Sequence, residues 1–449
     1  MDSLFEKLKH PQAPYYILLS LFLLHVLVMW PGGMTPDSHG QYTMAVTGMY
    51  RDDNPPMMSF VWRYLNMIYA GPGLILLLHL SFFYIALYIF MSTFKNQKIQ
   101  SFYLLLPLIP SVVVYSGMIW KDVAFAYSYL LLTAILTHFT ILKKPFSPAA
   151  GIVIFLVLFY GTAVKFQAQY CAPLILVWVA YIYNDTKFSL KTFSHIVVLN
   201  FIFFISLSSF HAVLVPQAGN SHFWQRVKIY DLAGISYETN KPLFPEFIKK
   251  PNFSMEKIRK NFNSQRVDDL FSDEGGLLPE GRDADQRQQL WNYWFKTVLQ
   301  HPLFYLKHRF CNLSYIVLSV PGLGKFTGSP VFWTPKLIMP HTPPSFASPT
   351  LINLFKIFGT LFIAPFLAIL LGIFYIILAI KALPYHKAAI PLLFINLISL
   401  DMVIMLLFFS MAGTPRYIYI SVCLTHASHA LAFLCWKALS QKRQAARTF

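Results

Sequence analysis

Residues 73–93 read GLILLLHLSFFYIALYIFMST, and this run determines the class of protein to which the chain belongs. It contains no Asp, Glu, Lys or Arg. A helix rises about 1.5 Å per residue, so a run of this length reaches about 30 Å, the thickness of the hydrocarbon core of a bilayer. The run therefore predicts a transmembrane helix.

Similar apolar runs recur on both sides of this one. The chain is 56% hydrophobic and 12% charged, and its mean hydropathy is +0.51, which excludes a soluble globular protein. We expect an all-α polytopic membrane protein with about ten spans. The expected spans are 15–30, 73–93, 101–119, 123–141, 149–164, 168–183, 192–210, 350–380, 388–410 and 417–436.

The basic residues predict the orientation of these spans. With the N-terminus inside, the cytoplasmic segments carry fourteen Lys and Arg residues: Lys7, Lys9, Lys95, Lys98, Lys143, Lys144, Lys187, Lys191, Lys381, Lys387, Lys437, Lys442, Arg443 and Arg447. The short outside segments carry five: Arg51, Arg63, Lys121, Lys165 and Arg416. This positive-inside bias places both termini in the cytoplasm. It also accounts for most of the net charge of +17 without a nucleic-acid partner.

The chain divides into three parts. Residues 1–210 form an N-terminal transmembrane module whose first outside loop is 31–70, and residues 349–449 form a C-terminal module. Between them, 211–348 is an extracytoplasmic segment that holds 11 of the 19 acidic residues. The first run follows Lys7 and Lys9 without a small-residue cleavage site, so we expect it to remain as an anchor.

Two polar stretches outside the membrane have amphipathic character. In the first outside loop, 40–67 predicts two short surface-lying helices separated at Pro55 and Pro56, because the residue before a proline resists the helical region. In the extracytoplasmic segment, 289–319 is an amphipathic stretch that we expect to run back towards the bilayer, with tryptophans at interfacial depth. The cysteines show neither a disulfide framework nor metal-ligand spacing.

Asp37 is the leading candidate for a catalytic residue. It follows the first span closely, in a protein that places few carboxylates beside the bilayer. An ordinary loop carboxylate or helix cap is the alternative, because Pro36-Asp37-Ser38 suits a turn or an N-cap. His39 and Asp53, on the same loop, are further candidates.

Basic residues on the outer side form the second group of candidates. Lys121 and Asp122 adjoin where the chain re-enters the membrane, and Lys165 and Arg416 lie at other outer ends. Snorkelling lysines and a capping aspartate are the alternative. Topology does not favour cations on this side, whereas a phosphate-bearing lipid headgroup gives a reason for them.

Two ionisable residues stand apart from these groups. Asp401 lies halfway along an expected span, where a charge is costly; we expect either a functional role or a structural bond to Lys356 or His426. Arg309, in the extracytoplasmic segment, has the chemistry to bind a phosphate bidentately, with a solvated helix face as the alternative. Gly322 to Lys325 is not a nucleotide-binding loop, because no strand precedes it. We find no Ser-His-Asp triad, HExxH or CxxC motif.

The layout and three features resemble the GT-C class of integral-membrane glycosyltransferases. An acid (Asp37) follows the first span in an amphipathic outside loop. The run Asp53-Asn54-Pro55-Pro56 is similar to the Asp-x-His-Pro-Pro-like stretch of several bacterial subfamilies. A large outside segment follows the seventh span and returns through 294–309. Asn54 departs from the pattern, because such subfamilies usually have histidine there, so the resemblance assigns no role to it.

The resemblance implies that the protein transfers a sugar, with inversion, from a polyprenyl-phosphate donor to an acceptor outside the membrane. Asp37 would be the general base, Asp122 the second acid, and Asp53 a secondary catalytic candidate. Lys121, Lys165, Arg309 and Arg416 would stabilise the phosphate leaving group, with His39 as a secondary candidate. Some members of the class use a divalent metal ion and many do not. The acceptor could be a glycan, a lipid or a protein.

Two other functions stay open at this point. An O-antigen ligase or polymerase also has many spans and a large outside loop, and it would use Arg282, Arg287, His301 and Arg309 there. A flippase or transporter of lipid-linked sugar should show inverted repeats and interrupted helices with charges near the midplane of the membrane. Only Asp401 and Lys356 hint at such charges. For all three functions, the absence of eukaryotic signals favours a bacterial inner membrane.

Overall fold

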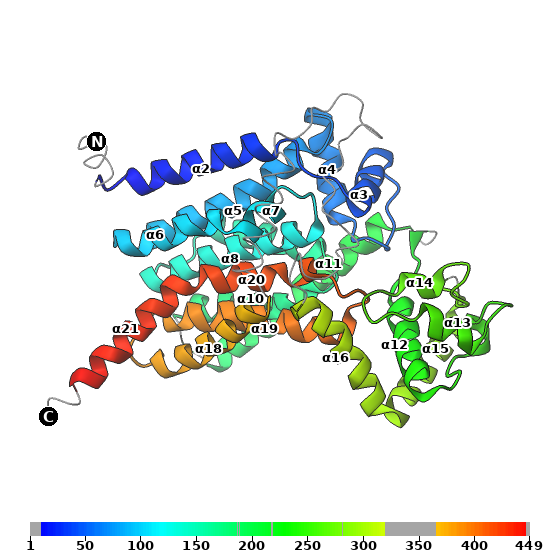
Figure 1. Cartoon of the computed structure of the whole chain (residues 1–449). Helices are drawn as coiled ribbons and strands as arrows, with labels where there is room; N and C mark the ends of the chain where they lie inside the picture. The colour runs from blue at the N-terminus through cyan, green and yellow to red at the C-terminus, as the bar shows by residue number, and fades with distance from the viewer. Residues whose placement is uncertain are drawn as a thin grey trace.

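The computed structural model describes residues 10–185, 187, 189–216, 219–280, 282–318 and 365–445. These residues form α-helices and short 3-10 turns, with isolated bridges and no strand (Figure 1). The expected all-α fold is therefore confirmed for the described part of the chain. Lys356, residues 322–325 and the start of the expected span 350–380 lie outside it.

Apolar helices form a bundle typical of a membrane-embedded protein. Five in the described ranges are long and apolar enough to cross a membrane: α5 (Gly73–Thr93), α8 (Lys121–Leu142), α11 (Leu190–Leu214), α18 (Pro365–Ala382) and α19 (Ala389–Phe409). The turn η5 (Pro415–Ile418) with α20 (Tyr419–Ala427), and then α21 (His429–Ala445), would make one more span, bent by 42°. Three apolar helices are shorter: α2 (Ala13–Met29), α9 (Pro148–Ala163) and α10 (Ala168–Tyr183).

The run expected as a span at 101–119 is not one continuous helix. It is divided into α6 (Gln97–Leu105), the 3-10 turn η1 (Leu106–Leu108) and α7 (Pro110–Ser116). Proline lacks the backbone N–H that a helix interior needs and clashes with the preceding turn. Pro107 and Pro110 therefore interrupt a segment whose apolar composition alone predicted a span.

The core of the bundle lies between α5 and α8. Phe83, Leu87 and Phe90 of α5 and Phe125 of α8 are all fully buried. In contrast, α11 buries only Thr192 and Phe203. A helix that is apolar all round yet hardly covered by protein is typical of one that faces lipid.

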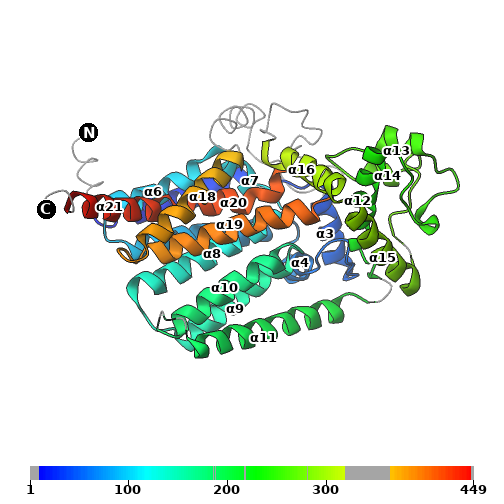
Figure 2. The same cartoon turned by 90° about the horizontal axis from the view of Figure 1, so that it is seen from below.

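A smaller lobe of helices stands at one end of the bundle (Figures 1 and 2). We call α12 to α15, with their connections, the lobe. Its elements are α12 (Trp224–Thr239), η3 (Glu246–Ile248), α13 (Met255–Asn261), α14 (Asp268–Phe271) and α15 (Ala284–Gln300). It has a core of its own that includes Ile229, Leu232, Leu270 and Leu290. The helix α16 (Pro302–Leu318) joins the lobe to the bundle, whereas α2 begins and α21 ends at the opposite end of the bundle.

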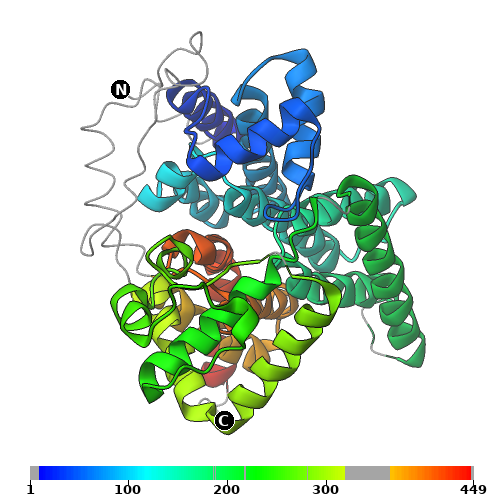
Figure 3. The same ribbon diagram turned by 90° about the vertical axis from the view of Figure 1, so that its right-hand side faces the viewer.

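Two short helices cover the lobe-side end of the bundle (Figure 3). They are α3 (Pro36–Thr47) and α4 (Met57–Ile68), separated at Pro55 and Pro56 as the sequence predicted. They pack together through the rings of Tyr42 and Trp62, whose centroids are 5.0 Å apart. Met67 and Ile68 at the end of α4 stay 69% and 79% exposed.

Candidate active site

The first turn of α3 is tied to the residues just before α8. Thr35 caps α3 through a reciprocal pair of bonds with Ser38. The Ser38 hydroxyl also donates to the Ile119 carbonyl at 2.5 Å, and the Trp120 indole donates to Thr35 Oγ1 at 2.9 Å. Asp37 therefore sits beside the start of α8, although the two segments are about eighty residues apart in the sequence.

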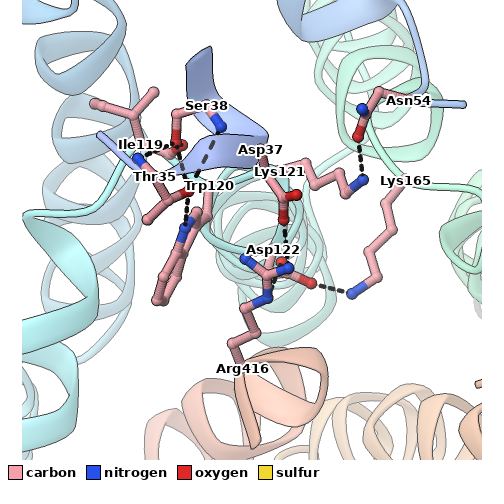
Figure 4. Close-up of polar contacts among 10 residues, drawn as sticks. All are labelled: Thr35, Asp37, Ser38, Asn54, Ile119, Trp120, Lys121, Asp122, Lys165 and Arg416. Atoms are coloured by element: carbon pink, nitrogen blue, oxygen red, sulfur yellow. Dashed lines mark hydrogen bonds and ion pairs between the residues drawn. The ribbon is translucent and has the colours of Figure 1, made fainter. Parts of the chain in front are cut away.

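Arg416, from η5, completes a cluster with two carboxylates (Figure 4). Its guanidinium donates a short hydrogen bond to Asp37 Oδ2, and its Nε lies 3.8 Å from Asp122 Oδ2. The side chain of Asp37 is 42% exposed, whereas those of Arg416 and Asp122 are 18% and 2% exposed. The cluster thus contains one accessible carboxylate and one enclosed carboxylate.

Lys165 holds the enclosed carboxylate from the other side. It lies in the connection between α9 and α10 and donates to Asp122 Oδ1 through a short ion pair (Figure 4). Its ammonium also lies 4.8 Å from the centre of the Tyr417 ring. Because both charges are almost fully buried, removing Asp122 would leave Lys165 without its counter-charge, and removing Lys165 would leave Asp122 with Arg416 alone, 3.8 Å away. Asp122 is therefore fixed in position rather than free to react.

Lys121 lies on the same face as Asp37 but differs from the other cations. Its ammonium donates to the amide oxygen of Asn54 at 2.5 Å. Within the described ranges it forms no ion pair, whereas Lys165 and Arg416 both do. Lys121 is thus a half-buried cation whose hydrogen-bond partner is neutral. Asn54, to which the resemblance assigned no role, positions it.

The surroundings of Asp37 keep its carboxyl group ionised. Burial raises the pKa of Asp37, but the charges of Arg416 and Lys121 and the bond from Arg416 outweigh burial, so the pKa lies below its ordinary value. Asp37 is consequently a carboxylate at neutral pH, with part of its surface open. Residues that line a small hollow beside it include Gln41, Met58 and Trp120.

The structure places three other candidates at the edge of this cluster or away from it. Asp53 lies 3.8 Å from Arg51 and accepts from the Asn54 amide at 3.1 Å, so it borders the cluster only through Asn54. Among the described residues, the imidazole of His39 contacts no member of the cluster, and burial lowers its pKa. Arg309 is elsewhere, in an ion pair with Asp231 where α16 meets the lobe.

Asp52 plays a structural part that sequence reasoning did not find. Its carboxylate accepts from the amide and hydroxyl of Ser221 at 2.7 and 2.6 Å and from the amide of His222 at 2.9 Å. It therefore ties the loop after α3 to the chain that leads into α12. The only signal in the sequence was the Asp52-Asp53 pair, which does not show that one of the two faces a segment 169 residues away.

Asp401 does not make the structural bond that was expected with His426. The His426 ring pairs with His429 at 2.9 Å instead, and the polar neighbour of Asp401 is Cys171. The other expected partner, Lys356, is outside the described residues. The structure therefore leaves Asp401 as an acid within α19 that is separate from the Asp37 cluster.

The residues around Asp37 do not fit a divalent metal ion. No group of three or more His, Cys, Asp or Glu side chains in the described part of the chain is placed to hold one. The two carboxylates of the cluster face Arg416 and Lys165, so their charges are already balanced by protein cations. We therefore derive no step through a metal ion.

The chain matches no protein-family model, no curated protein sequence and no solved structure.

Proposed function

We propose that the protein is an inverting glycosyltransferase of the GT-C type that takes a sugar from a polyprenyl-phosphate donor. One observation carries the proposal. A partly exposed, ionised carboxylate, Asp37, is held by Arg416 beside Lys121, a cation that forms no ion pair with any acid in the described part of the chain, at one end of an apolar bundle. A general base next to an anion site is what this transfer needs.

The proposed topology places the lobe and the Asp37 cluster outside the membrane. The chain then crosses about ten times, with both termini in the cytoplasm of a bacterial cell and the protein in its inner membrane. The excess of basic residues on the opposite side supports this orientation. The start of α2 and the end of α21 at the end of the bundle away from the lobe also support it.

In the proposed reaction, Asp37 removes the proton from an acceptor hydroxyl. The hydroxyl oxygen forms a bond to the anomeric carbon from the face opposite the phosphate. The bond between that carbon and the phosphate oxygen breaks, and polyprenyl phosphate leaves with the electron pair. Lys121 binds the phosphate and Arg416 orients Asp37. Asp122 holds Arg416 in place, and Lys165 holds Asp122.

The first experiment measures sugar transfer in membranes that contain the wild type or Asp37→Asn at matched expression, with a polyprenyl-phosphate sugar pool. Asparagine keeps the size and removes the base, so transfer should fall by about 10²- to 10⁴-fold. The control is Glu246→Gln, which changes a side chain that is 89% exposed on the lobe. It should leave transfer unchanged.

Two outcomes would contradict the proposal. Full transfer by Asp37→Asn would exclude Asp37 as the base and direct attention to Asp53 and Asp122. No transfer by the wild type, from a donor pool that a known transferase consumes, would exclude the donor class. The acceptor, whether glycan, lipid or protein, is identified by isolating the labelled product.

A flippase for lipid-linked sugars is a second candidate, favoured by one observation. The helix pair α20 and α21 breaks at Ser428, where buried polar groups meet: the Asn396 amide donates to the Ser428 hydroxyl at 3.2 Å, and Ser399 and Thr425 pair at 3.3 Å. Broken helices with polar interiors are typical of transporters. Movement of a labelled donor across proteoliposomes, unchanged by Asp37→Asn, would favour this function.

The contacts of Arg309 and Arg282 do not favour a ligase or polymerase. That function needs free arginines in the extracytoplasmic segment, but the Arg309 guanidinium is fully buried against Asp231. Arg282 is also used internally, since it donates to Gln225 at 3.2 Å and to the Leu278 carbonyl at 2.8 Å.

A further inference from the structure

The chain between α19 and Arg416 is held by the lobe and by α16. We call residues 410–415 the strap. The Gly413 amide donates to the Gln265 carbonyl at 2.5 Å, and the Val267 amide donates to the Met411 carbonyl at 3.1 Å. Arg309 donates to the Ser410 carbonyl at 2.7 Å. Three hydrogen bonds therefore fix the position of this irregular segment.

Arg309 reaches the strap from a closed pocket. Its Nε lies 2.6 Å from Asp231 Oδ1, and both side chains are 1% exposed or less. The Trp294 indole donates to the other oxygen of Asp231 at 2.9 Å. Taking two charges out of water costs desolvation free energy that their attraction often only just offsets, so a buried ion pair adds little net stability. It does fix the direction in which the guanidinium points, which is towards Ser410.

A second contact fixes the strap independently of this ion pair. Gly413 lies against Tyr315 of α16, so closely that a Cβ atom at position 413 would be 2.5 Å from the Tyr315 Cβ. Real Cβ atoms essentially never approach so closely, so any larger residue would push the strap away from α16. The position of the strap is therefore sensitive to one methyl group.

Arg416 follows Gly413 by three residues and makes the bond to Asp37. We propose that Asp231 and Arg309 are positioning residues which, through the strap, seat Arg416 against Asp37, so that the lobe controls the catalytic base. Asp37 lies on α3 and faces Arg416 of η5 and Lys121 of α8, with Asp122 behind Arg416. If the strap moves, Arg416 is the member of this group that is displaced. That Asp37 is a catalytic base rests on the proposed function, whereas the seating of Arg416 against Asp37 through the strap does not.

The test uses the purified full-length protein and Arg309→Lys, a variant that keeps the charge but loses the forked geometry that spans Asp231 and Ser410. Arg226→Lys is the matched control. Arg226 also forms an ion pair in the lobe, with Glu280 at 2.6 Å, and its contacts with the described residues are to Glu280, Phe223 and Phe271 rather than to the strap.

The first readout is hydrogen exchange at the Gly413 amide, which should become at least about tenfold faster in Arg309→Lys and stay unchanged in Arg226→Lys. The second is the pH dependence of carbodiimide labelling at Asp37, which requires the protonated acid and no enzymatic activity. Loss of the Arg416 contact should move this dependence to higher pH, by about one unit. The acid limb of the transfer rate should move by the same amount.

Gly413→Ala gives a second route to the same displacement, for the case in which Arg309→Lys does not fold. It leaves the ion pair intact and should change both readouts in the same direction. Unchanged exchange in both variants would overturn the inference, and so would faster exchange without a change in Asp37 labelling. If the wild type transfers no sugar but labelling still shifts, the proposed function fails while the positioning role stands.

Discussion

Two ion pairs of this protein each join an arginine to an aspartate, but the two pairs have different surroundings. Asp37 pairs with Arg416 at the end of the bundle, and its side chain is 42% exposed. Asp231 pairs with Arg309 under the lobe, and its side chain is 1% exposed, with one oxygen bonded to Trp294 and His308 Nε2 3.6 Å from the other. The first carboxylate can meet a substrate, whereas the second cannot.

The difference shows that two ion pairs of the same residue types can leave their carboxylates with very different access to solvent. In both pairs an arginine holds a carboxylate in one orientation. In the Asp37 pair the arginine is the better-buried partner, so the acid is oriented and still accessible. In the Asp231 pair both partners are enclosed, so their charges serve the architecture.

The largest expected effect is a loss of stability when the buried pair of Asp231 and Arg309 is broken. Asp231→Ala leaves the Arg309 guanidinium without its counter-charge, and we expect a loss of about 3–5 kcal/mol in the free energy of unfolding. Asp37→Ala should cost less than about 1 kcal/mol, because the acid is partly exposed and Arg416 keeps Asp122 nearby. Unfolding in detergent measures both losses, and equal losses would remove the distinction.

The next effect separates stability from activity within the Asp37 cluster. Lys165→Met leaves Asp122 with Arg416 alone, at 3.8 Å, and should cost about 2 kcal/mol of stability. Lys165→Met combined with Asp122→Asn removes both charges and should restore most of that stability without restoring sugar transfer. A double variant as unstable as the single one would show that the pair is not energetically coupled.

A smaller effect concerns pH. The pKa of Asp37 is lowered, so the base is ionised, and transfer should be lost only as pH falls below the ordinary carboxyl range. Arg416→Met removes the main opposing charge while burial continues to raise the pKa. The acid limb of the transfer rate should therefore move to higher pH, by about 1–3 units. A limb that stays in place would mean that another group titrates.

The smallest effect concerns Asn54. Asn54→Ala removes the acceptor that positions Lys121, which should cost about 1 kcal/mol and raise the KM for the donor about fivefold with little change in kcat. Asp53→Asn is the comparison, because the ion pair that Asp53 makes among the described residues is with Arg51, which is 61% exposed. Its effect should be smaller. A greater effect of Asp53→Asn would place that acid in the site.

The sequence was enough to expect the residues of the Asp37 cluster on one side of the membrane. It was not enough to predict which of them pair with one another. The predicted topology alone placed five residues on the outer side of the membrane, because each follows or precedes an expected span at its outer end: Asp37, Lys121, Asp122, Lys165 and Arg416. Arg309 belonged to the same side but turned towards Asp231, since packing of the lobe decides where it points. The broken run at 101–119 shows a local cause instead: its prolines outweigh its apolar composition.

The starts of α3 and α8 have a further consequence. Each has its acid in the first turn, Asp37 or Asp122, so the positive ends of two helix macrodipoles point into one small region. Free backbone amides at such ends bind anions well. Neutralising Asp37 removes one negative charge but leaves both dipoles in place. Asp37→Asn should therefore hold an anionic donor at least as tightly as the wild type while failing to consume it, which makes it the form in which to capture the bound lipid.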